Sequence, residues 1–292
     1  MKCMCAKEPL SNLPCTPVSR VGRPAARLRP IPFALMLAVT LLLPPAPLLA
    51  DQALRMGPFV QSVLGDRATI LWFTDQNKPG TVKFGLAADK LDRTARYTAR
   101  PIPNGSCPNA KFAHEAVLTD LPAGADVYYQ LIDPADPQGV ACFRSDPGPS
   151  GTIRFICAGD EVWFDGYLPY LQANGLRLDF ILDLGDYQSR VGRYGRPWWR
   201  QIPVYMAWGN HNTPDTEKHG WALPGDKISY SFDLGPAFFA FTSGPSAAKT
   251  SAAWKIAAEH PEMISNGKGA NETERAAKYA DAGYAMRLNG ND

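Results

Sequence analysis

Histidine is scarce in this chain, and the patterns of repetitive or low-complexity proteins are missing. The 292 residues include only four histidines, so few nitrogen ligands are available to any metal site. No internal repeat and no low-complexity tract is present, which excludes repeat architectures. The composition, with 45% hydrophobic and 20% charged residues, is that of a globular protein with room for one large domain or two modest ones.

An excess of basic charge is also missing once the first 50 residues are set aside. Six of the 30 Lys and Arg residues lie in that segment together with one acidic residue, which leaves 24 basic against 27 acidic residues elsewhere. A protein that binds nucleic acid usually carries a positively charged surface. We therefore expect no nucleic-acid partner.

Residues 1–50 have the three parts of a signal peptide. Basic residues precede an apolar stretch at 33–43, and Ala50 closes the segment before Asp51. Two prolines end the apolar stretch well short of the ~20 residues that span a bilayer. We predict that residues 1–50 are removed, and that the protein is periplasmic or secreted with no stable membrane span. The alternative is an uncleaved signal anchor.

Only three of the six cysteines lie beyond the expected signal peptide, at Cys107, Cys142 and Cys157. An oxidising compartment permits a disulfide between Cys107 and Cys142, with Cys157 as a buried thiol. Free thiols are an equal alternative.

Residues 51–148 have the pattern of an all-β sandwich. Short segments rich in β-branched and aromatic residues recur at intervals of about 8–12 residues, with no helical stretch between them. These segments are 67–74, 81–84, 114–118, 126–132 and 140–143. We expect Trp72, Tyr128 and Tyr129 in the core or at its rim, and His114 in solvent. The Pro- and Gly-rich segment 146–151 marks the boundary to a second domain at 152–292.

Three apolar segments of this second domain each end in a glycine that is followed by a possible metal ligand. They lead to Gly159-Asp160, to Gly185-Asp186 and to Gly209-Asn210-His211. In an open α/β sheet, ligands bind at the edge that the carboxyl ends of the strands form. Oxygen ligands suit divalent and trivalent metals, and a carboxylate can bridge two ions about 3.5–4 Å apart. The pattern therefore predicts a metal centre that acts on phosphate esters.

Both halves of the chain resemble the purple acid phosphatases, which are calcineurin-like metallophosphoesterases. Segments 57–61 (GPFVQ), 67–74 (RATILWFT) and 121–129 (LPAGADVYY) are similar to the fibronectin-type N-terminal domain of that family. The three strand ends described above are similar to its phosphoesterase domain. So are three further segments, 230–235 (YSFDLG), 254–263 (WKIAAEHPEM) and 287–292 (RLNGND). The resemblance implies a fibronectin III-like sandwich followed by an α/β (α+β) metallophosphoesterase domain that is incomplete at its C-terminus.

Transferred residue by residue, the resemblance implies a ligand set for one or two ions of Fe, Zn or Mn. Asp160 would ligate the first metal, Asp186 would bridge, and Asn210 would ligate the second. His211 would contact the phosphate and stabilise the transition state or protonate the leaving group. The reaction would be attack of a metal-bound hydroxide on a small phosphate ester.

A further ligand is expected from the loop before Pro261. Glu259 occupies the position of the family's histidine ligand, and His260 lies next to the proline. Both side chains can bind metal, the first through oxygen and the second through nitrogen. His260 is the ligand we predict.

Other positions depart from the family pattern. Val162 replaces a His or Gly, Ser189 stands where a tyrosine gives the purple colour, and Asn291 stands where a histidine ligand belongs. We expect no purple colour. Loss of a residue that supports a metal ligand typically lowers metal affinity or activity by ~10–100-fold. Loss of a direct ligand should lower them by at least as much. These departures favour the alternative of a non-catalytic exported binding module, or of a fragment with a degenerate phosphoesterase domain.

Overall fold

The structure is a computed structural model, and it describes most of the chain beyond the expected signal peptide. The described residues are 54–78, 80–104, 106–107, 109–159, 164–186, 197–242, 245–246, 249–260 and 272–290. The predicted signal peptide lies outside them, as does the predicted ligand Asp160. The three positions that depart from the family pattern, Val162, Ser189 and Asn291, also lie outside the described residues.

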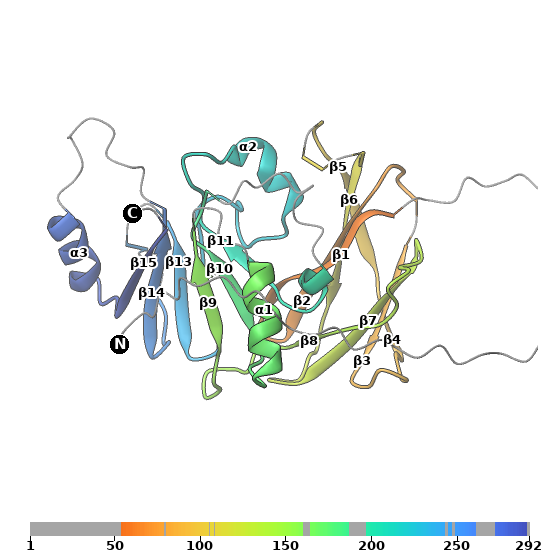
Figure 1. Cartoon of the computed structure of the whole chain (residues 1–292), viewed down its shortest axis with the longest axis horizontal. Helices are drawn as coiled ribbons and strands as arrows, with labels where there is room; N and C mark the ends of the chain where they lie inside the picture. Colours follow the sequence, from red (N-terminus) through yellow and green to blue (C-terminus); the bar gives the residue numbers. More distant parts are fainter. Residues whose placement is uncertain are drawn as a thin grey trace, which may run out of the picture. The chain divides into compact units, whose positions relative to one another are not determined.

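The first half of the described chain forms two antiparallel sheets (Figure 1). One sheet has the strand order β1-β2-β6-β5 and the other has the order β4-β3-β7-β8. The strands are β1 Leu54–Leu64, β2 Arg67–Thr74, β3 Thr81–Gly85, β4 Arg93–Ala95, β5 Tyr97–Pro101, β6 Phe112–Leu118, β7 Asp126–Asp133 and β8 Ala141–Arg144. Both sheets contribute to one core, with Ile70 and Trp72 from the first and Val82 and Tyr129 from the second. The fibronectin type of this sandwich stays a prediction.

His114 corrects one expectation, because it is buried in this sandwich and not solvated. Its ring stacks on that of Trp72, the residue opposite on the neighbouring strand, with ring centroids 5.2 Å apart. Its Nε2 lies 2.7 Å from Oγ1 of Thr74. Burial disfavours the charged imidazolium and lowers the pKa of His114 to about 4.

The second half contains a parallel sheet and a mixed sheet. The parallel sheet has the order β11-β10-β9, and the mixed sheet has the order β12-β13-β14-β15 with only the β12–β13 pair antiparallel. The strands are β9 Phe155–Ala158, β10 Phe180–Asp183, β11 Val204–Met206, β12 Tyr230–Leu234, β13 Ala237–Phe241, β14 Trp254–Glu259 and β15 Met286–Asn289. Rings of Phe180 and Tyr205 from the first sheet contact Phe239 and Phe232 from the second. The two sheets therefore share one aromatic core.

Short helices connect these strands in the described segments. They are α1 Phe164–Ala173, η2 Pro197–Arg200, α2 Pro214–Glu217, η3 Lys218–Gly220 and α3 Glu272–Asp281. Parallel strands need a crossover, and α1 supplies it between β9 and β10. The helix ends at Ala173, and the positive φ of 68° at Gly175 just beyond it lets Leu176 N donate to Leu171 O at 2.9 Å.

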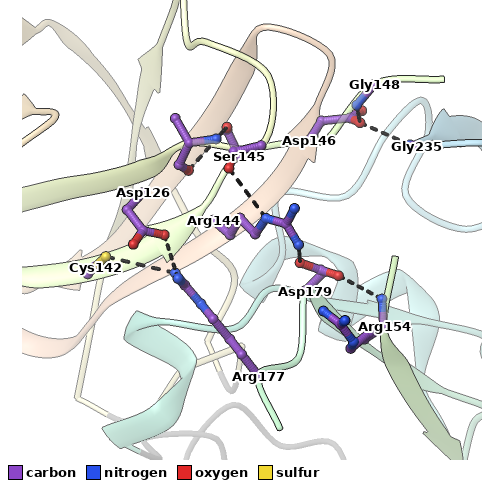
Figure 2. Close-up of polar contacts among 12 residues, drawn as sticks. Asp126, Cys142, Arg144, Ser145, Asp146, Gly148, Arg154, Arg177, Asp179 and Gly235 are labelled. Carbon is purple, nitrogen blue, oxygen red and sulfur yellow. Dashed lines mark hydrogen bonds and ion pairs between the residues drawn. The ribbon is translucent and has the colours of Figure 1, made fainter. Parts of the chain in front are cut away.

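Asp146 anchors the segment between the two halves. Its carboxylate accepts backbone hydrogen bonds from Gly65 at 2.8 Å, from Gly148 at 2.8 Å and from Gly235 at 2.9 Å. Figure 2 shows the carboxylate of Asp146 beside Gly148, with a dashed line to Gly235. The three donors come from the β1–β2 turn, the connecting segment and the β12–β13 turn. One buried carboxylate thus joins the sandwich to the second half.

A second polar contact lies nearby, between β8 and the start of β10. Arg144 Nη1 donates to Asp179 Oδ1 at 3.0 Å, and the other oxygen of Asp179 accepts from Arg154 N at 2.6 Å (Figure 2). The apolar core continues across the same boundary, because Phe59 of β1 packs against Trp199 with ring centroids 5.3 Å apart. The two halves therefore share both polar and apolar contacts.

No disulfide joins the three described cysteines, so the optional Cys107–Cys142 bridge is not formed. Cys157 is exposed, which corrects the expectation of a buried thiol. Burial raises the pKa of the Cys107 thiol to about 12.

Within the described segments, no helix has the length and apolar character that crossing a membrane requires.

Candidate metal centre

Three elements of the second half deliver polar side chains to one place. Asp186 follows β10, Asn210 and His211 follow β11, and His260 follows β14. Strands β10 and β11 are parallel neighbours in one sheet, whereas β14 belongs to the other. The site therefore lies where the carboxyl ends of strands from both sheets meet.

His260 is held in one orientation by the backbone. Its side chain has no exposed surface, and its Nδ1 lies 2.8 Å from Leu184 O. A carbonyl oxygen can only accept, so Nδ1 carries the hydrogen and Nε2 points the other way. Nε2 lies 3.0 Å from Asp186 Oδ2 and 3.1 Å from Asn210 Oδ1. Three possible ligand atoms from three segments thus converge.

These separations fit the ligands of a single cation. Two ligand atoms ~2.1 Å from one ion and at right angles to each other are ~3.0 Å apart. One carboxylate, one imidazole and one amide oxygen suit a borderline divalent metal. In the described residues no group of three His, Cys, Asp or Glu side chains is placed to hold a metal, so a metal ion here would need the amide of Asn210 as a third donor. The donors present fit one ion.

Asp186 has a strained backbone with φ of +54°, in the left-handed region that non-glycine residues rarely adopt. Its side chain is 95% buried, and its Oδ1 accepts from His211 N at 2.8 Å. Strain of this kind costs on the order of 1–3 kcal/mol and persists only where the surroundings enforce it. The conformation aims the other carboxylate oxygen at His260.

Two glycines make this approach possible. Gly185 has φ of +94°, and a Cβ there would lie 2.7 Å from His260 Cβ. A Cβ on Gly209 would collide with the carboxylate of Asp186. Both positions therefore need glycine so that the strand ends can close on each other.

His211 lies at the rim of the site. Its side chain is 74% exposed, and its Nε2 is 3.9 Å from Asp186 Oδ2. Its backbone N–H is held by Asp186, whereas its ring faces solvent. The ring can therefore reach a bound ligand without first breaking a buried contact.

Glu259 points away from the site and is part of a separate buried cluster. Its Oε2 accepts from Tyr279 Oη at 2.9 Å, and its Oε1 pairs with Arg287 Nε. Of the two candidates in this loop, the structure brings His260 and not Glu259 to Asp186. Asp160, the expected ligand of a first metal, lies outside the described residues.

Sequence reasoning missed three residues that shape the site. Asp183 Oδ1 accepts from Gly185 N at 3.0 Å, and Asn212 and Glu217 brace the loop after β11. The only signal for Asn212 was its place in the Gly209–Asn212 motif, and neither of the other two stood in a recognisable pattern.

Comparison with solved structures finds a likeness in fold. Purple acid phosphatase PPD1 isolated from yellow lupin (Lupinus luteus) seeds superposes with a TM-score of 0.61 at 13% identity, over 80% of this chain and 57% of that one. PhoD matches with a TM-score of 0.45 at 15% identity, over 74% of this chain and 63% of that one. The chain thus spans little more than half the length of the lupin enzyme. No family model and no curated protein matches it.

Proposed function

We propose that this chain is an exported metal-dependent phosphoric ester hydrolase of the acid phosphatase type. The observation that carries the proposal is the convergence of His260 Nε2 with Asp186 Oδ2 at 3.0 Å and Asn210 Oδ1 at 3.1 Å. The likeness in fold to a purple acid phosphatase supports it.

Asp186, Asn210 and His260 would hold the ion, one of Fe, Zn or Mn, and Asp160 would belong to a site for a second. Such an ion binds phosphate oxygens and lowers the pKa of a water molecule so that it becomes a nucleophile. His211 is placed at the exposed rim, where its ring can donate to a phosphate oxygen or to the leaving group. Its backbone bond to Asp186 keeps the ring beside the ion site.

The proposed location is periplasmic or extracellular, after removal of residues 1–50. The basic, apolar and small-residue segments of the leader support it. The proposed substrate is a small phosphate ester, because the body of the chain has no basic excess that would attract nucleic acid.

A second candidate is a non-catalytic exported binding module. The small donor set in the described residues favours it, since the amide of Asn210 must serve as a third ligand. A neutral amide oxygen contributes no charge, so it attracts a cation less than a carboxylate does.

The two candidates are separated by metal content and by hydrolysis of p-nitrophenyl phosphate with added Mn, Zn or Fe. We expect metal-dependent hydrolysis that Asp186→Asn and Asn210→Ala each reduce by at least ~10–100-fold. Asp186→Asn removes the charge but keeps the shape of the side chain, and asparagine tolerates the positive φ at this position. The matched control is Asp179→Asn, the same change at the other end of β10, which should retain activity. Activity that survives both site changes contradicts the proposal, and a folded protein with neither metal nor turnover supports the binding module.

A further inference from the structure

Asn212 links the two loops that form the candidate metal centre. Its Oδ1 accepts from Gly209 N at 2.7 Å and from Asp186 N at 3.2 Å. One donor follows β11 and the other follows β10. A single side-chain oxygen therefore fixes the separation of the two strand ends that carry Asp186 and Asn210.

The chemistry of its partners fixes which way this amide faces. Both backbone groups can only donate, so the oxygen of Asn212 must face them and the nitrogen must face away. The nitrogen lies 3.3 Å from Glu217 Oε2, and a carboxylate can only accept from it. Glu217 is in turn held by Thr213, whose N and Oγ1 donate to Oε1 at 3.2 and 2.8 Å.

Burial makes this arrangement specific. Asn212 is 8% exposed and Glu217 is 7% exposed, so an amide turned the other way would leave unmatched polar groups away from water. The bond to Asp186 N also supports the left-handed backbone with φ of +54°. That backbone directs the carboxylate of Asp186 at His260.

We infer that Asn212, oriented by Glu217, is a positioning residue that holds Asp186 and Asn210 in the geometry for metal binding. The inference rests on the proposed metal centre, in which Asn212 is not one of the proposed ligands. Groups that orient metal ligands typically change affinity or activity by ~10–100-fold when they are removed. Asn212 acts on two segments at once, because one oxygen serves both backbone donors.

The test is titration of the full chain with Mn²⁺ by isothermal calorimetry. We expect Asn212→Ala to weaken Mn²⁺ binding by ~10–100-fold. In the metal-free protein, hydrogen exchange of the Asp186 and Gly209 amides should become faster, because both lose their acceptor. If Asn212 contributed only to general stability, the substitution would not speed up exchange of these two amides selectively.

If Asn212→Ala does not fold, the test uses variants in which Asn212 and Glu217 exchange their amide and carboxylate groups. Asn212→Asp places two carboxylates against each other and should weaken Mn²⁺ binding. Adding Glu217→Gln restores an amide–carboxylate pair with the roles exchanged and should recover most of the affinity. The control is Asp179→Ala, which loses an acceptor of Arg154 N at the opposite end of β10 and should leave Mn²⁺ affinity unchanged.

The outcomes distinguish the inference from the proposed function. Unchanged Mn²⁺ affinity in a folded Asn212→Ala protein overturns the inference, and it leaves the metal centre standing if Asp186→Asn still weakens binding. An equal loss in Asp179→Ala also overturns the inference, because the effect would then follow general stability. Absence of Mn²⁺ binding by the unaltered protein overturns both.

Discussion

The imidazole of His260 and the carboxylate of Asp186 face each other between the two sheets of the second half, with Nε2 3.0 Å from Oδ2. The two residues follow strands that belong to different sheets, so neither sheet alone creates the contact. The carbonyl of Leu184 sets the orientation of the imidazole, and a strained backbone sets that of the carboxylate. The site therefore depends on how the two sheets pack.

We predict that His260→Ala and Glu259→Gln have different consequences although the residues are adjacent. His260→Ala should lower metal affinity by at least ~10-fold, because it removes a direct donor. Glu259→Gln should instead lower stability by about 1–3 kcal/mol, because it removes the charge that pairs with the partly buried Arg287. Calorimetric metal titration and urea unfolding of both variants check this. A reversed pattern would contradict the assignment of His260 to the site.

Glycine substitutions give a second prediction with a matched control. Gly185→Ala should reduce both stability and metal affinity, because it adds a Cβ 2.7 Å from His260 Cβ at φ of +94°. Gly175→Ala also lies at positive φ, but no atom lies within 4 Å of its added Cβ. It should cost only about 1–2 kcal/mol of stability and leave metal affinity unchanged. Equal metal affinities in the two variants would show that close approach at Gly185 is not needed.

The main strands of the fold could be predicted from sequence because their signals are local. The segment 67–74 matches β2, and Gly185-Asp186 and Gly209-Asn210 follow β10 and β11 as expected. Strands β4 and β5 were missed because their short sequences, RTA and YTARP, are largely polar. Helix α3 was missed as well, although its sequence, ETERAAKYAD, is rich in the strong helix formers Ala, Glu, Arg and Lys.

The choice between Glu259 and His260 shows what sequence could not supply. Alternate residues of a strand face opposite sides, and the sequence Ala257-Ala258 gives no sign of which side faces the shared core. In the structure Ile256 and Ala258 face that core. His260 is the next residue in this alternating series, so it lies on the same side, whereas Glu259 lies on the other. His114 was misjudged for a related reason, since its cross-strand partner Trp72 is fixed only by the strand register.

Asp146 should be essential for the joint stability of the two halves. Asp146→Ala removes the acceptor of three backbone donors, and hydrogen bonds to charged groups contribute about 1.5–3 kcal/mol each. We expect a loss of at least about 2 kcal/mol in the free energy of unfolding. Chemical unfolding followed by circular dichroism measures it. Asp66→Ala, an exposed aspartate in the turn beside Gly65, should stay within about 0.5 kcal/mol of the unaltered protein.

The buried His114 predicts a loss of stability in mild acid. Its pKa is about 4 in the folded protein, below its value of 6.5 when exposed. The unfolded chain therefore binds a proton that the folded one does not, and this stability is lost as pH falls from above 6.5 towards 4. Between pH 7 and pH 5 the loss should be about 2 kcal/mol.

A comparison of unfolding curves isolates this effect. His114→Phe keeps a ring that can stack on Trp72 but has no titratable group, so its stability should fall by about 2 kcal/mol less over the same pH interval. The same pH dependence in both proteins would mean that other groups cause it.

The most direct test of the metal centre is anomalous diffraction from crystals grown with Mn²⁺ and measured at its absorption edge. The account predicts an anomalous peak in contact with Asp186 Oδ2, Asn210 Oδ1 and His260 Nε2, and no such peak in the Asp186→Asn protein. Well-ordered crystals without a peak between these three atoms, or with an ion bound only elsewhere, would contradict it.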